Sequence, residues 1–166
     1  MKFIKTLLLS SVVVALAGCA GYQLGSTLPD DVQTVSLHVV NNTEEPQIEV
    51  AVMKALGAEI QMDGRLKLCS ENEADSILTV TLNDFDLHAL AFDSRRGSLV
   101  REYRIAISAS SVLTRKDGEV VVETPEILGE SEFEYNNDLT SSKRGALPSA
   151  AADLARKAVS LVTTAW

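Results

Sequence analysis

The fold is decided by the stretch Leu78-Thr79-Val80-Thr81-Leu82-Asn83-Asp84-Phe85-Asp86-Leu87-His88-Ala89-Leu90-Ala91. Every second residue is apolar from Leu78 to Leu82, and the alternation resumes in the opposite phase from Phe85 to Ala91. Alternation of this kind predicts a half-buried β-strand. Because the phase changes once, near Asn83-Asp84, we expect one long strand with a β-bulge at that point.

Two more long strands are expected after this stretch. The segment Asp93-Ser94-Arg95-Arg96-Gly97 has the composition of a turn, and the alternation resumes from Tyr103 to Leu113. Lys116-Asp117-Gly118 predicts a hairpin turn. A last alternating run extends from Val120 to Tyr135, and Pro125 within it indicates a sheet edge or a bulge, because proline has no N–H to donate.

Before the deciding stretch, the sequence predicts a strand over residues 34–40, a helix, and a short strand over residues 66–69. The segment 41–46 (Asn41 to Pro46) offers capping side chains, acidic residues and a proline, so we expect the helix to begin there. Asp63-Gly64 ends it, because glycine readily adopts the left-handed conformation of a C-terminal cap. The apolar face of this helix comprises Ile48, Val52, Ala55, Leu56 and Ile60.

The chain ends in a second amphipathic helix, with Pro148 near its first turn. Its apolar stripe comprises Leu147, Ala151, Leu154, Ala158, Leu161, Val162 and Ala165. One face of the sheet is the economical place to bury both stripes. We therefore expect an α+β fold, a two-layer sandwich with two helices packed on one face of a mostly antiparallel four-stranded sheet.

The other face of this sheet carries Glu130, Glu132 and Glu134, with Arg104 and Ser108 on the neighbouring strand. These charges either pair across the strands in solvent or contact a partner. The sequence leaves both interpretations open.

The N-terminus has the pattern of a cleavable signal. Lys2 and Lys5 precede an apolar run over residues 7–16, which is too short for a bilayer core that needs about 20 residues. The run ends in Leu16-Ala17-Gly18-Cys19, which resembles the bacterial lipobox. We expect a signal peptide over residues 1–18, a lipidated segment and linker over 19–33, and a folded domain over 34–166. An ordinary secretory signal is the alternative, but it would leave the Cys19 thiol without a purpose.

Composition argues against several classes of function. The formal net charge of −8 disfavours a nucleic-acid partner. His38 and His88 are the only histidines and belong to no metal or nucleophile motif, so we expect no enzyme and no cofactor. Asp84 and Asp86 share a strand face and are expected to be a solvated pair. We expect Cys69 to be a small buried hydrophobe.

Several short motifs, in their order along the chain, resemble the LptE family of lipopolysaccharide-assembly lipoproteins. They are the lipobox, Gly21-Tyr22-Gln23-Leu24-Gly25, Leu28-Pro29, Val32 to Val40, Asn42-Thr43, Glu45-Pro46-Gln47-Ile48-Glu49, Asp63-Gly64 and Ala152-Asp153-Leu154-Ala155. The resemblance implies a similar sandwich that sits inside the LptD β-barrel as a plug and assembly factor. It implies no reaction and no cofactor. With Ala20 in place of aspartate after Cys19, it implies anchoring in the outer membrane.

The resemblance also implies contacts with lipopolysaccharide. It places a basic residue in the Arg95-Arg96 turn and another near Lys143-Arg144, and guanidinium groups bind phosphate through paired hydrogen bonds. Solvated charges are the plainer interpretation of both pairs. A different function also stays open, that of an auxiliary lipoprotein subunit of a periplasmic lipid-trafficking ABC transport system.

Overall fold

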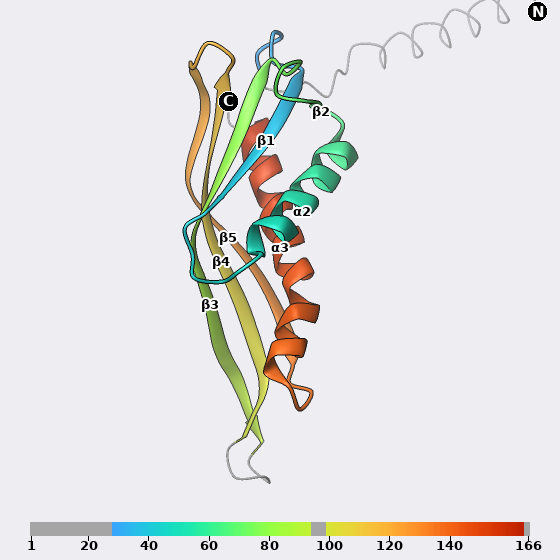
Figure 1. The fold of residues 1–166 in the computed structure, drawn as a ribbon, viewed down its shortest axis with the longest axis vertical. Helices are drawn as coiled ribbons and strands as arrows, with labels where there is room; N and C mark the ends of the chain where they lie inside the picture. The colour runs from blue at the N-terminus through green and yellow to red at the C-terminus, as the bar shows by residue number, and fades with distance from the viewer. Residues whose placement is uncertain (1–27, 94–98, 165–166) are drawn as a thin grey trace, which may run out of the picture.

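The computed structural model describes residues 28–93 and 99–164 (Figure 1). This part of the chain forms five strands and two helices. In chain order they are β1 (Thr34–Asn41), α2 (Ile48–Asp63), β2 (Lys67–Leu68), β3 (Ser76–Asp93), β4 (Leu99–Arg115), β5 (Val120–Glu134) and α3 (Leu139–Thr164).

The strands form one mixed sheet in the order β2-β1-β3-β4-β5. The expectation of a mostly antiparallel four-stranded sheet is therefore wrong in detail. β1 pairs in parallel with both β2 and β3, whereas β3, β4 and β5 are antiparallel. The reason lies in α2, because a helix that carries the chain back along the sheet makes the flanking strands parallel.

The expected irregularities of the long strands are confirmed. The register shifts between Leu82 and Asp84, where β3 contains one extra residue. A second shift lies between Thr124 and Ile127 of β5, at Pro125, and β5 is an edge strand. The first bulge reverses the phase of the alternation, so both Leu82 and Phe85 face the core.

Both helices cover one face of the sheet, as expected (Figure 1). Val52, Leu56 and Leu154 are fully buried between the layers, but Leu161 is 42% exposed. The buried face of α3 rotates along the helix, from Ala146 near its start to Thr163 near its end, and Leu161 is left beside this face.

The two helix starts differ from the expectation. α2 begins at Ile48, after Gln47 in a left-handed conformation (φ 64°), and no side chain caps it. Asn41 instead ends β1, where its amide donates to the Glu45 carbonyl and to a Glu49 carboxylate oxygen, each at 3.0 Å. Pro148 lies inside α3, because Asp138 caps that helix ten residues earlier by accepting hydrogen bonds from the Thr140 and Ser141 amides.

The end of α2 follows the sequence closely. Gly64 is left-handed, with φ 74°, and its N–H donates to the Ile60 carbonyl at 3.1 Å. Glycine is suited to this position because it has no Cβ to clash.

Gly129 sets the distance between β5 and α3. A methyl group at this position would lie 2.5 Å from the Leu154 Cβ and 2.8 Å from the Ala150 carbonyl oxygen. Both neighbours belong to fully buried residues of α3, so neither can move without shifting the helix. Close packing of α3 on the sheet therefore requires glycine here.

We predict that Gly129→Ala lowers the free energy of unfolding by about 1–3 kcal/mol, because it forces the helix away from the sheet. Gly145→Ala is the matched control. It lies in α3 with open space around it, and should raise stability by up to about 1 kcal/mol. Urea unfolding of both variants measures the difference, and equal stabilities would contradict the close-packing argument.

Candidate functional site

The sheet face opposite the helices is rich in acidic side chains. The register places Glu132 opposite Arg104, Glu130 opposite Ala106, and Glu134 opposite Glu102. Arg104 donates to Glu132 from Nη2 at 2.6 Å and from Nε at 3.2 Å, and lies 3.6 Å from Glu130. The hydrogen bond with Glu132 raises the pKa of the Arg104 guanidinium. Cross-strand pairing is therefore present for two of these three glutamates.

Glu134 and Glu102 remain as a directly opposed pair of like charges. No ion pair connects either of them to a cation among the residues that the structure describes. Like charges at opposite positions destabilise a sheet slightly. This end of the face therefore carries excess negative charge.

Among the described residues, the acidic side chains do not gather in the way that metal ligands do. Asp84 and Asp86 do share the open face, as expected, and Asp86 lies 4.0 Å from His88. Within residues 28–93 and 99–164, no three His, Cys, Asp or Glu side chains gather as metal ligands would. Cys69 is a free thiol and only half-buried, so the expectation of a small buried hydrophobe is wrong.

Lys143 is held by contacts within the domain. Its Nζ lies 2.7 Å from a Glu45 carboxylate oxygen and 5.7 Å from the centre of the Phe85 ring. Both carboxylate and ammonium are largely shielded from solvent. This pair ties the first turns of α3 to the β1–α2 connection and to β3.

Arg144 is exposed beside a shallow cavity of ≈ 320 Å³, lined by Glu45, Pro46, Gln47, Thr140, Lys143, Arg144 and Leu147. No ion pair holds its guanidinium among the described residues. Of the two basic residues singled out here, Arg144 is therefore the one available to an external anion. The Glu45–Lys143 pair spans 98 positions and has no local signal in the sequence.

Arg95 and Arg96 lie outside the described residues, as does Cys19. The segment that contains the two arginines follows the end of β3 at Asp93 and precedes the start of β4 at Leu99. Asp93 is eight residues beyond Phe85 on β3, or about 25 Å in an extended strand. Lys143 packs on Phe85, at the other end of this stretch of β3.

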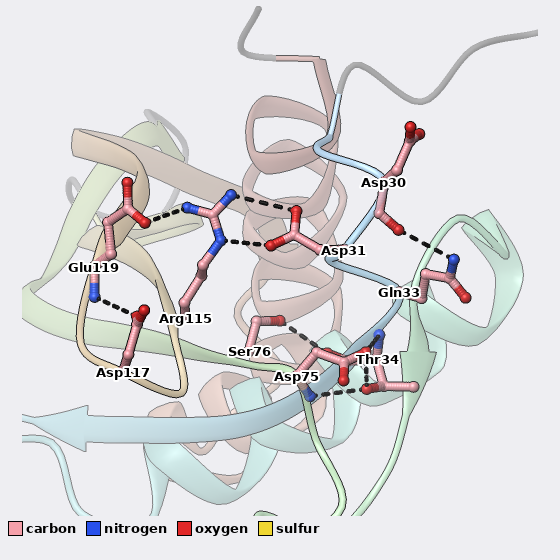
Figure 2. A network of polar contacts seen from close by, with 9 residues as sticks. All are labelled: Asp30, Asp31, Gln33, Thr34, Asp75, Ser76, Arg115, Asp117 and Glu119. Atoms are coloured by element: carbon pink, nitrogen blue, oxygen red, sulfur yellow. Dashed lines mark hydrogen bonds and ion pairs between the residues drawn. The ribbon is translucent and has the colours of Figure 1, made fainter.

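At the other end of the sheet, a polar network fixes the segment that leads into β1 (Figure 2). Arg115 donates to Asp31 from Nε at 2.8 Å and Nη2 at 3.3 Å, and to Glu119 from Nη1 at 2.6 Å. These bonds hold the pKa of the Asp31 carboxyl below its usual value of 3.8, against the desolvation that raises it. The network joins the segment just before β1 to the β4–β5 hairpin.

A second contact in Figure 2 joins the start of β1 to the start of β3. The Thr34 hydroxyl donates to the Asp75 carboxylate at 2.7 Å, and the Asp75 N–H donates back to that hydroxyl at 2.9 Å. The Thr34 hydrogen bond lowers the pKa of Asp75 below 3.8. These hydrogen bonds hold the starts of the parallel strands β1 and β3 together.

We predict that unfolding becomes easier in acid. Asp31 and Asp75 have lower pKa values in the folded state than in the unfolded chain. Their stabilisation is therefore complete above the unfolded value of 3.8 and is lost as pH falls through the folded values. Urea unfolding between about pH 2 and 7 measures this.

The variant Asp31→Asn should show a shallower decline of stability in acid than the parent. Asp30→Asn is the control, because the Asp30 carboxylate is exposed and makes no ion pair with a described residue. If the two variants show the same pH dependence, the Arg115 contact does not stabilise the fold.

Residues 32–162 match the sequence profile of one family, described as LptE, lipopolysaccharide-assembly. The matched range runs from just before β1 to near the end of α3. No curated protein sequence matches the chain.

Solved structures with the same fold include three lipoproteins. A minor lipoprotein from Acinetobacter baumannii has a TM-score of 0.54 and 11% identity, covering 80% of this chain and 92% of that one. For a lipoprotein from Caulobacter crescentus the values are 0.53, 15%, 75% and 88%. For lipoprotein B from Nitrosomonas europaea they are 0.52, 14%, 86% and 88%. At these identities, the similarity shows the fold alone.

Proposed function

This chain belongs to the LptE family of lipopolysaccharide-assembly proteins, and on that premise we propose that it is the lipoprotein partner of an LptD-like β-barrel in the outer membrane. The family match over residues 32–162 carries the proposal, because it includes every described strand, the whole of α2 and nearly all of α3. In this role the domain acts as plug and assembly factor for the barrel, and catalyses no reaction.

Cys19 anchors the chain in the membrane through its lipid in this proposal. The support is the Leu16-Ala17-Gly18-Cys19 lipobox, and Ala20 favours the outer membrane. Two or more acyl chains hold a protein durably on a bilayer. Neither helix of the described residues is long and apolar enough to cross a membrane.

In this proposal, exposed basic residues make the contacts with lipopolysaccharide. Arg95 and Arg96 belong to segment 94–98, which connects β3 to β4. Arg144 is the second candidate, because its guanidinium is exposed. Lys143 acts mainly by positioning, since Glu45 already neutralises its charge.

Depletion and co-purification test the proposed function together. We expect the full-length protein to co-purify with a large outer-membrane barrel. Depletion should leave that barrel misassembled and the outer membrane permeable to large antibiotics. Normal barrel assembly after depletion would favour the auxiliary subunit of a lipid-trafficking ABC system instead.

We predict that the double change Arg95→Asp and Arg96→Asp weakens lipopolysaccharide binding by the purified full-length protein about tenfold or more. The reason is that hydrogen bonds to charged groups contribute roughly 1.5–3 kcal/mol each. Lys54→Asp with Lys67→Asp is the control, because it changes the net charge equally at two exposed lysines elsewhere. If both double variants lose the same binding affinity, the effect comes from the net charge of the protein and not from a contact of Arg95 and Arg96.

A further inference from the structure

The two edges of the sheet differ in how they are protected. On β5, the Glu130 N–H donates to the Asp153 carboxylate at 3.0 Å, and Lys157 donates to the Leu128 carbonyl at 2.7 Å. Pro125 removes a further donor from the same strand. Side chains of α3 thus occupy outward-facing backbone groups of β5, which prevents another strand from pairing there.

Over most of its length, the opposite edge is not protected in this way by any described residue. β2 pairs with β1 only at Thr34 and Val35, so from Ser36 to Asn41 β1 has a strand on one side alone among the described residues. The Val35 carbonyl accepts from Cys69 N on the β2 side, whereas Asn42 N donates to Leu82 on the β3 side.

This alternation fixes the direction of the remaining backbone groups of β1. Successive residues of a strand direct their N–H and C=O to opposite sides. The odd-numbered residues Leu37 and Val39 therefore direct theirs to the free edge, and no described residue pairs with them there. Unpaired backbone groups of this kind are a template for another strand.

An apolar groove of ≈ 370 Å³ lies next to this edge, between β1 and α2, and is lined by Val39, Glu49, Val50, Met53 and Lys54. Val50 is 63% exposed and Met53 36% exposed, so together they leave apolar surface open beside the edge of β1. A strand paired with β1 would place alternate side chains in this groove and cover both residues.

The charge around the groove indicates the chemistry of the occupant. Glu49 keeps its negative charge, because the Asn41 amide that donates to it is neutral. Lys54 and Lys67 are both exposed, and neither makes an ion pair with any described residue. These three side chains together carry one net positive charge. It complements a segment that carries an acidic residue among alternating apolar ones.

We propose that an extended segment of the partner barrel, apolar with an acidic residue, adds as a strand to the free edge of β1. Its backbone pairs with Leu37 and Val39, and its side chains cover Val50 and Met53. The inference rests on the proposed function, since it assigns the binding surface for the partner named there.

The test compares variants of the full-length protein by the amount of barrel that co-purifies from outer-membrane extracts. Val39→Pro removes an N–H that points away from β3, so the sheet can still form. Val50→Glu leaves β1 intact and places a negative charge at the groove. Both should reduce recovery of the barrel tenfold or more.

Leu128→Glu is the matched control, because Leu128 is an equally apolar residue, 43% exposed, at the protected edge. It should recover the barrel within about twofold of the parent, since that edge is closed to strand addition. Thermal melts of all variants should show that each is folded, and Val50→Glu decides if Val39→Pro does not fold.

A photo-crosslinking residue at Met53 identifies the occupant of the groove. We expect an adduct with one segment of the barrel, lost in Val50→Glu. Recovery of the barrel by both edge variants would overturn the inference and leave the proposed function standing. An adduct with residues 20–27, a second copy or another protein would overturn it as well. If the parent itself captures no barrel, the proposed function fails and the inference fails with it.

Discussion

The close approach of α3 to β5 at Gly129 is the constraint on which the rest of the structure depends. Because no side chain separates the two backbones there, Leu154 reaches the core and Asp153 and Lys157 reach the edge of the strand. The same helix carries Lys143 to Glu45 near its start and presents the Thr163 carbonyl to Arg65 near its end. One helix thus holds the sheet, the second helix and the protected edge in register.

Much of this fold can be predicted from the alternation of apolar residues and from the glycine and proline residues at turns and edges. The phase change near Asn83 gives the bulge, Pro125 gives the irregular edge, and Gly64 gives the helix end. The parallel pairing of β1 is harder to predict, because it depends on where α2 carries the chain. Pro148 wrongly suggests the start of the last helix. The helix begins ten residues earlier, where Asp138 accepts hydrogen bonds from the first amides.

The functional residues are less accessible to sequence reasoning than the fold. A basic pair such as Lys143-Arg144 gives no sign that Lys143 is neutralised by Glu45, because the partners are far apart in the chain. The edge of β1 that no described strand covers is equally hard to predict, because it depends on β2 having only two residues. The acidic open face, by contrast, follows directly from the alternation of Glu130, Glu132 and Glu134.

The central functional claim is that the partner barrel adds a strand to the edge of β1. Hydrogen–deuterium exchange of the full-length protein, alone and with its purified barrel, tests this claim most directly. Strand addition would slow exchange at residues 36–41, where the amides of Leu37 and Val39 would gain partners. Exchange near Glu130 would stay unchanged, because Asp153 already accepts that hydrogen. A barrel complex that leaves residues 36–41 as fast as in the free protein would contradict the account.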